Sequence, residues 1–166
     1  MELNPYAKYL GDQDPLEVLA STYIKLIKLV EHVPEDHIKL RPPSGKWSAR
    51  EIVAHMADCE IAFAFRLKQT LSEDHPTMQP FDQDRWASRY GNFDMSNGLR
   101  LFSALRDWNL LLLWEVTPQE WDRTTTHPER GTMTLRTIAE TMAGHDLNHI
   151  AQLERIAGPL KAPTLR

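Results

Sequence analysis

Residues 137–159, TIAETMAGHDLNHIAQLERIAGP, are the stretch that decides the fold. Apolar residues recur there every three or four positions, which predicts an amphipathic helix with one face toward a core, and Gly158 followed by Pro159 is a helix stop signal. His145 and His149 lie one turn apart on the core-facing stripe of this helix. The other members of the stripe are Leu135, Ile138, Met142, Leu153 and Ile156. Burying an unpaired polar group costs on the order of 1–3 kcal/mol, so two imidazoles in such a stripe need a common explanation.

Three further segments have the same helical spacing, and together they predict an all-α fold. We expect helices over residues 15–33, 48–71, 96–116 and 134–158. The second begins with a capping box, in which Ser48 is the N-cap and Glu51 lies at N3. No segment alternates convincingly with a period of two, and four helices of about 20 residues imply a four-helix bundle.

One long connection separates the second and third predicted helices. Residues 72–94 contain two prolines and no clear period, apart from a helical turn near residues 82–86. A connection this long inside a compact domain is usually functional or covers other elements, and it permits a topology other than simple up-down-up-down. The heptapeptide HPERGTM, residues 127–133, is consistent with a small excursion or hairpin.

The totals of the chain bound its class. The 166 residues are expected to form a single domain, residues 1–166, and the formal net charge of −4 argues against a general nucleic-acid binder. Cys59 is the one cysteine, so no internal disulfide can form and a cytoplasmic location is the simplest expectation. We expect no signal peptide and no membrane span, because the first residues lack an apolar segment and the longest apolar run is short.

His55 adds a third histidine to the pair. It lies between Ile52 and Cys59 on the inward stripe of the second predicted helix. Facing helices can bring three imidazoles together, and three neutral imidazoles suit Zn²⁺, Ni²⁺ or Fe²⁺ with a coordination position left open, as in catalytic sites. The alternative is that each histidine is a separate core residue bonded to a backbone carbonyl. His75 and His127 stand beside prolines in loops, and we interpret both as surface residues.

The pentapeptide HDLNH, residues 145–149, also looks like the H-E-x-x-H motif of zinc peptidases. Asp146, however, is one methylene shorter than the glutamate that acts as base in that motif, and no histidine follows His149 to supply a third ligand. A third ligand from an upstream helix differs from those enzymes, and we therefore set this interpretation aside.

The chain resembles the DinB superfamily and, within it, the YfiT-like, bacillithiol-transferase branch. The resemblance rests on GKWSAREIVAHMADCE (residues 45–60), RLKQTLSEDHPTMQPFDQDRW (residues 66–86) and HDLNHIAQLERI (residues 145–156). It implies a four-helix bundle with a three-histidine divalent metal site, often zinc or nickel, and frequent dimerisation. Members of this family include thiol S-transferases, a maleylpyruvate isomerase that uses low-molecular-weight thiols, and proteins named as metal-dependent hydrolases.

Residue by residue, the resemblance implies that His55, His145 and His149 are the metal ligands. Asp58, three residues after His55, is a candidate for orienting a ligand imidazole, or else a solvated or capping carboxylate. Cys59 lies one turn from His55 and could be a fourth ligand or a redox thiol, although a lone helical cysteine is more often a small buried hydrophobe.

The resemblance also covers residues that could hold a cofactor or substrate. Arg66 matches the family's arginine and could bind a carboxylate of the thiol or substrate, or else pair with an acid such as Asp82 or Asp107. Asp82 and Trp86 match the Pro-aromatic-Asp…Trp segment, with Phe81 where a tyrosine is common. Phe81 and Trp86 could cover the metal as a lid, or they could only anchor the long connection.

The three inward histidines predict a metal-dependent site, and the resemblance implies an enzyme that transfers a low-molecular-weight thiol to a small electrophilic substrate. A hydrolase that uses water at the same metal, and a non-catalytic metal-binding or small-molecule-binding bundle, remain as alternatives. We expect no nucleic-acid or membrane partner. We also expect a homodimer, because Trp108, Leu111 and Trp114 of the third predicted helix add apolar surface beyond its core stripe.

Overall fold

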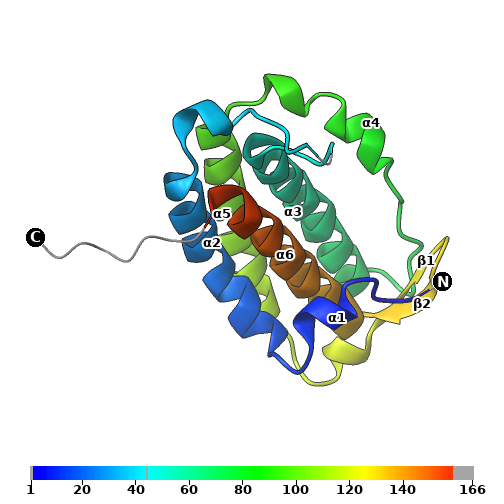
Figure 1. Cartoon of the computed structure of the whole chain (residues 1–166). Helices are drawn as coiled ribbons and strands as arrows, with labels where there is room; N and C mark the ends of the chain where they lie inside the picture. Colours follow the sequence, from blue (N-terminus) through cyan, green and yellow to red (C-terminus); the bar gives the residue numbers. More distant parts are fainter. Residues whose placement is uncertain (1, 44, 159–166) are drawn as a thin grey trace, which may run out of the picture.

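Four long helices form the frame of the protein, as the sequence predicts. The computed structural model describes residues 2–43 and 45–158. The long helices are α2 (Pro15–His32), α3 (Ala49–Ser72), α5 (Met95–Trp114) and α6 (Leu135–Ala157), and they pack as a bundle (Figure 1). The short helices and helical turns are α1 (Ala7–Leu10), η1 (Glu35–His37), α4 (Gln83–Ala87), η2 (Tyr90–Asn92) and η3 (Glu120–Asp122). None of the described helices combines the length and apolarity that a membrane span requires.

Cap residues set the ends of the long helices. Asp14 accepts hydrogen bonds from two backbone N–H groups in the first turn of α2, and Ser48 forms the predicted reciprocal capping box with Glu51. Gly158 ends α6 with a φ of 72°, whereas Pro159 lies outside the described residues. The bounds of the four helices therefore differ from the predicted bounds by at most two residues.

The order of the helices around the bundle explains the long connection. α2 and α3 each pack against both α5 and α6, so these two consecutive helices occupy diagonal corners. α3 and α5 run parallel: Gly98 lies against Val53 near their N-terminal ends, and farther along the Lys68 Nζ lies 5.4 Å from the Trp108 ring centroid. The chain must therefore return along the bundle between these helices, and Figure 1 shows this return on the outside, with α4 partway along it.

A small β-hairpin lies beside the helices, in the segment where the sequence allows an excursion or a hairpin. Strands β1 (Thr124–His127) and β2 (Gly131–Thr134) pair antiparallel, so the sequence HPERGTM does form a turn, with strand residues on both sides. Each strand has four residues, too short to show a clear alternation in the sequence. The Met78 N–H donates to the Thr126 carbonyl at 2.8 Å, which ties the start of the long connection to the hairpin.

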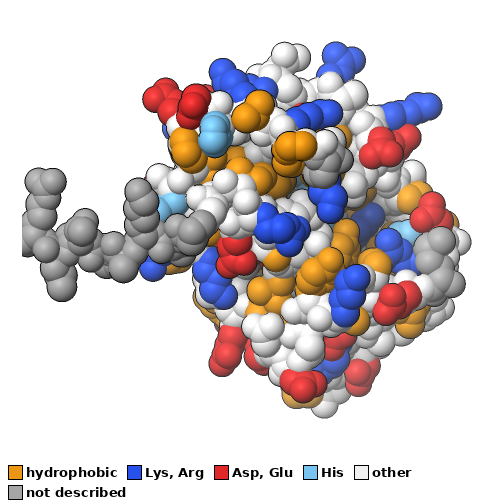
Figure 2. Space-filling model, in the orientation of Figure 1, with side chains coloured by type: hydrophobic (Ala, Val, Ile, Leu, Met, Phe, Trp, Pro, Cys, Tyr) orange, Lys and Arg blue, Asp and Glu red, His pale blue; other side chains and the backbone are white. Residues whose placement is uncertain are grey.

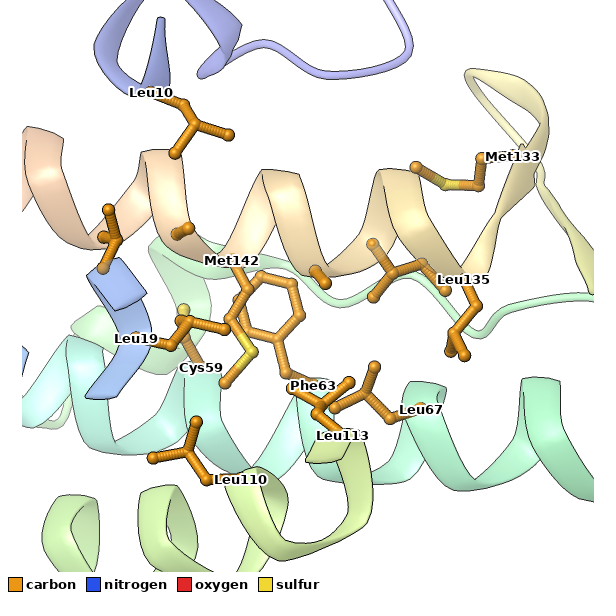
Figure 3. Close-up of a cluster of buried hydrophobic side chains, with 14 of the residues drawn as sticks. Leu10, Leu19, Cys59, Phe63, Leu67, Leu110, Leu113, Met133, Leu135 and Met142 are labelled. Atoms are coloured by element: carbon orange, nitrogen blue, oxygen red, sulfur yellow. The ribbon is translucent and has the colours of Figure 1, made fainter. Parts of the chain in front are cut away.

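Apolar side chains from all four long helices fill the interior. Figure 3 shows Leu19 of α2, Phe63 of α3, Leu110 of α5 and Met142 of α6 gathered in one cluster. A second cluster lies around Leu26 of α2 and contains side chains from the same four helices. The bundle therefore has a continuous apolar interior, which makes its few buried polar side chains conspicuous.

A buried ion cluster joins the four long helices. The Arg106 guanidinium of α5 contacts Glu60 of α3 and lies 2.7 Å from a carboxylate oxygen of Asp146 on α6. It also donates to the Leu19 carbonyl of α2 at 2.9 Å. Asn109 donates to the second oxygen of Glu60 at 3.0 Å, and all of these side chains are buried. Charged groups this deeply buried are stable only when they are paired.

The core face of α5 contains polar as well as apolar side chains. Phe102 and Leu113 are buried and Leu112 packs against the core, and Arg106 and Asn109 are buried as well. From the local sequence alone, an arginine and an asparagine are predicted to be surface residues. The partners that make their burial favourable lie on other helices, and the local sequence does not reveal them.

The N-terminal segment packs against α6 at a position that only glycine permits. A Cβ on Gly144 would lie 2.6 Å from the Tyr6 carbonyl oxygen and 2.8 Å from the Tyr6 Cβ. The absence of a side chain at Gly144 therefore lets the backbone before α1 lie directly on α6. This contact places the Tyr6 ring beside His145, one residue farther along α6, with the ring centroids 5.3 Å apart.

Substituting Arg106→Met should strongly destabilise the protein, because Glu60 and Asp146 would remain buried without their counter-charge. We expect the free energy of unfolding, measured by urea denaturation followed by circular dichroism, to fall by about 3–5 kcal/mol. Arg100→Met is the matched control, since Arg100 lies on the same helix but is exposed, and its effect should stay within about 0.5 kcal/mol. Equal stabilities of the two variants would contradict the structural role given to Arg106.

Candidate metal centre

The structure brings His55, His145 and His149 together in the interior of the bundle. The Nε2 atoms of His55 and His145 lie 2.9 Å apart, and each ring is less than a tenth exposed. The His149 ring centroid lies 4.4 Å from that of His145 and 4.8 Å from that of His55. The three inward histidines predicted from two separate helices thus form one cluster, with their rings in mutual contact.

Aromatic side chains enclose this cluster. Trp47 precedes α3 and lies over two of the rings, with its centroid 4.6 Å from His55 and 6.2 Å from His149, the latter nearly parallel at 16°. Tyr90 of η2 is fully buried with its ring centroid 6.3 Å from His55. Because Trp47 and Tyr90 come from connections rather than from the long helices, the loops complete the wall of the site.

Burial and mutual repulsion set the charges of the three imidazoles. Burial and the neighbouring His145 lower the pKa of His55 to about 3. Burial, followed by the other two histidines, lowers the pKa of His149 well below its usual value. Burial also disfavours the charged form of His145, but the adjacent Cys59 and Asp146 outweigh it and raise the pKa of His145 to about 10. The cluster therefore favours one positive charge beside two neutral imidazoles.

Cys59 belongs to the cluster as well as to the apolar core. Its Sγ lies 3.4 Å from the Nε2 of His55, and the side chain is buried. The potential ligand atoms of His55, Cys59 and His145 all lie within 4.8 Å of one another. Both interpretations drawn from the sequence, a small buried hydrophobe and a fourth ligand, are therefore compatible with its position.

The residues present suit a divalent metal ion. Nδ1 of His149 is buried and has no hydrogen-bond partner among the described residues, a costly arrangement for an imidazole nitrogen. Ligand atoms of His55, Cys59 and His145 lie within 4.8 Å of one another, and imidazole nitrogen and cysteine sulfur are typical donors for Zn²⁺ and related ions.

Asp146, rather than Asp58, is the carboxylate beside a ligand candidate. Its Oδ1 lies 3.8 Å from the Nδ1 of His145, on the opposite side of the ring from His55. Burial acts to raise the pKa of Asp146, but the Arg106 guanidinium outweighs burial and lowers it. Asp58 is half-buried, and its pKa is raised by burial while the Tyr90 hydroxyl opposes this shift. The structure thus places Asp58 beside Tyr90 and not beside a histidine nitrogen.

A cavity of about 170 Å³ opens next to the cluster. Cys59 and His145 form part of its wall, together with apolar side chains that include Phe63, Met78 and Met133. This volume is below the 300–1,000 Å³ of pockets that hold drug-sized ligands, so the cavity suits a small molecule or one end of a larger one.

On the face of the molecule shown in Figure 2, basic and acidic side chains are interspersed around a band of hydrophobic side chains.

The three residues predicted to hold a cofactor or substrate have different positions. Arg66 lines the cavity, and its Cζ lies 5.6 Å from the Phe81 ring centroid. Asp82 caps α4 and forms an ion pair with Arg85 at 3.2 Å, so it is not the partner of Arg66. Trp86 packs on Phe81 with the ring centroids 4.6 Å apart, and Phe81, not Trp86, lines the cavity.

His127 corrects another expectation. It is not a surface residue: its relative exposure is 8%, and it lines the cavity from the end of β1, whereas His75 is exposed as predicted. Arg130, in the turn of the hairpin, lines the same cavity and was not singled out from the sequence. A hairpin turn rich in polar residues is read as solvent-exposed, and nothing local reveals that it folds back over a cavity. Trp47, by contrast, could be found from the sequence, because it belongs to the motif GKWSARE (residues 45–51) at the start of α3.

Comparison with known proteins gives a consistent picture. The profile of the DinB superfamily matches residues 19–153. A protein of Oceanobacillus iheyensis named "Putative metal-dependent hydrolase" is 32% identical over 66% of this chain, and the match spans 64% of that protein, less than two thirds of its length. "Putative metal-dependent hydrolase YfiT" of Bacillus subtilis is 27% identical, and the match covers 86% of this chain and 82% of that protein.

Solved structures share the fold. YfiT from Bacillus subtilis superposes with a TM-score of 0.77 at 27% identity, covering 85% of this chain and 84% of that chain. That protein is described as a probable metal-dependent hydrolase with an unusual four-helix bundle topology. A mycothiol-dependent maleylpyruvate isomerase superposes with a TM-score of 0.66 at 13% identity, covering 84% of this chain and 59% of that chain, which shows similarity of fold.

Replacing one member of the histidine cluster should remove the bound metal. We expect the purified wild-type protein to contain about one divalent ion per chain by inductively coupled plasma mass spectrometry. His149→Ala should lower the metal affinity by at least the roughly 10–100-fold loss that changes around metal ligands cause. His37→Ala is the control, because the His37 side chain is 51% exposed, and it should keep the metal. Wild-type protein without metal, or full occupancy in His149→Ala, would contradict the assignment.

Proposed function

Because the chain belongs to the DinB superfamily, we propose that it is a metal-dependent enzyme that transfers a low-molecular-weight thiol to an electrophilic carbon. The observation that carries the proposal is the convergence of three buried imidazoles beside a small cavity. His55, His145 and His149 would hold one divalent ion, with Zn²⁺ and Ni²⁺ as the best candidates for imidazole ligands. Cys59 lies close enough to take part in ligation or to line the reaction space.

A bound divalent ion would supply one kind of chemistry, since it favours the ionised form of a thiol or a water molecule at neutral pH. In the proposed reaction the thiol sulfur forms a bond to the electrophilic carbon. The bond from that carbon to the leaving group breaks, and the leaving group takes the electron pair. The thiol proton is released to solvent, so no oxidant or reductant is needed.

The residues of the chain would position the reactants and exclude water. Trp47 and Tyr90 cover one side of the histidine cluster, and Tyr6 covers His145 from the N-terminal segment. Asp146 lies against the Nδ1 side of His145, and Arg106 holds Asp146 in place. The apolar part of the cavity wall suits the carbon skeleton of a thiol or an electrophile.

The choice between a thiol and water as nucleophile does not rest on a carboxylate base. Among the described residues, Glu129 is the one carboxylate in the cavity wall, and it is exposed. A divalent ion would favour the ionised form of a thiol or of water without such a base. The thiol draws support from the mycothiol-dependent isomerase, whose bundle shares the fold. Hydrolysis remains the second candidate because of the names given to the relatives.

We also propose that the outer face of α3 and α5 is a homodimer interface. The large apolar side chains exposed on this face are Ile61, Phe65, Leu101, Trp108, Leu111 and Trp114. At the surface Lys68 of α3 lies over the Trp108 ring of α5, so the two helices are in contact along this face. An apolar surface of this extent is typical of a face that packs against another protein, and a second copy would bury it.

A leaving-group assay separates the two reactions. Metal-loaded protein is mixed with 1-chloro-2,4-dinitrobenzene, with and without a panel of low-molecular-weight thiols, and chloride release is followed. We expect release only when a thiol is present, at a rate about 100-fold above that of His149→Ala. Chloride release without a thiol would favour hydrolysis instead. Absence of turnover with several electrophiles, under conditions where the metal is bound, would contradict an enzymatic role.

The interface should be sensitive to a charge at its centre. Wild-type protein is expected to elute as a dimer of the 19.2 kDa chain in size-exclusion chromatography with light scattering. Trp108→Glu should shift the mass to that of the monomer without loss of metal. Ile24→Glu is the control, because Ile24 is similarly exposed at 55% but lies on α2, and it should remain dimeric. A monomeric wild type, or a dimeric Trp108→Glu variant, would overturn this interface.

A further inference from the structure

Two arginines from distant parts of the chain line the cavity beside the histidine cluster. Arg66 comes from α3, two turns beyond Cys59, and Arg130 comes from the turn between β1 and β2. Two hydrogen bonds to the Pro76 carbonyl hold the hairpin at this position. The Thr126 backbone N–H donates at 2.9 Å, and the Thr125 hydroxyl donates at 2.8 Å. The start of the long connection therefore fixes one arginine opposite the other.

Neither guanidinium has a partner of opposite charge within residues 2–43 and 45–158. Among the residues that the structure describes, no carboxylate lies within 4.0 Å of Arg66 or Arg130 and no side-chain hydrogen bond engages either group. Nε of Arg130 is buried without any partner. By contrast, Arg106 is paired with two carboxylates, and Arg123 donates to the backbone carbonyls of Thr70 and Glu73. Unpaired guanidinium groups beside a cavity are a common feature of anion-binding sites.

The charges of these arginines act on each other and on His127. Burial lowers the pKa of Arg66, and the positive charge of Arg130 lowers it further, while Cys59 opposes both effects. Burial lowers the pKa of His127, followed by the charges of Arg130 and Arg66, while Glu129 opposes these effects. The two guanidinium groups therefore lie close enough to act on each other and on His127, and this end of the cavity carries two positive charges against the one carboxylate of Glu129.

His127 provides a third hydrogen-bond donor at this end. Its Nδ1 lies 3.2 Å from the backbone nitrogen of Glu129 and accepts the hydrogen bond from that N–H group. A neutral imidazole that accepts at Nδ1 carries its proton on Nε2. The ring can thus donate a hydrogen bond without being charged.

We propose that Arg66, Arg130 and His127 form an oxyanion clamp that binds a carboxylate or phosphate group of the substrate or the thiol. The planar guanidinium presents paired N–H donors that match two oxygens of such a group. Cys59 and His145 line the same cavity, so a molecule held by this group extends toward the histidine cluster. The clamp selects small anionic molecules and fixes which end of the molecule faces the reactive centre; this orienting role rests on the proposed function.

Binding of simple anions tests the clamp without turnover. Succinate and inorganic phosphate are titrated by isothermal calorimetry into wild-type protein and into His149→Ala, so that binding is read with and without the metal site. We expect at least one of the two anions to bind both proteins, and the stronger of the two identifies the oxyanion as carboxylate or phosphate. Absence of binding by either anion to both proteins would overturn the proposal, whatever the outcome of the thiol assay. An anion that binds the wild type but not His149→Ala would place the site at the metal and would also overturn it.

Substitutions locate the anion on the three residues. Arg66→Met and Arg130→Met should each weaken binding about tenfold or more, and His127→Phe should weaken it by a smaller factor. Glu129→Gln should strengthen binding, because it removes the one carboxylate that lines the cavity. Arg85→Met is the control, since the Arg85 side chain is 87% exposed and lies outside the cavity. Unchanged affinity in Arg66→Met and Arg130→Met, with circular dichroism confirming that both are folded, would overturn the assignment.

Discussion

The ion cluster around Arg106 is the constraint on which the rest of the structure depends. One guanidinium meets a carboxylate of α3, a carboxylate of α6 and a backbone carbonyl of α2, so a single side chain of α5 fixes the positions of the other three long helices. Apolar packing alone tolerates small shifts and rotations of helices, because dispersion and hydrophobic contacts have no preferred direction. Buried ion pairs do not tolerate them, since a displaced partner leaves an unpaired charge. This cluster therefore sets the register of α3 against α6, and this register brings His55 to His145.

The same cluster also shapes the electrostatics of the metal centre. Glu60 and Asp146 are the sequence neighbours of Cys59 and His145, so two carboxylates face one guanidinium directly behind the histidines. Burial lowers the pKa of His55 and of His149, and neighbouring histidines lower both further. The pKa of His145 is raised instead, because Cys59 and, after it, Asp146 outweigh burial. The bundle thus combines neutral imidazole donors at His55 and His149 with a favoured positive charge at His145.

The sequence predicts the helices and the convergence of the histidines well, because both follow from local periodicity. Apolar spacing locates the four long helices, and the same stripes place His55, His145 and His149 on inward faces. What the sequence does not predict depends on contacts between distant segments. The burial of Arg106 requires partners on three other helices, and the burial of His127 requires the hairpin to fold over the cavity. Periodicity holds no information on either contact, so His127 is interpreted as a surface residue and the burial of Arg106 is not predicted.

The parallel arrangement of α3 and α5 accounts for most of the remaining site. Two parallel neighbours that follow each other in sequence need a connection as long as the bundle, and this chain uses that connection to bring side chains to the centre. Met78 and Phe81 line the cavity from its first half, and Tyr90 reaches His55 from its second half. An antiparallel pair with a short turn would leave the histidine cluster open on this side. The parallel arrangement of α3 and α5 requires a long connection, and this connection covers the histidine cluster.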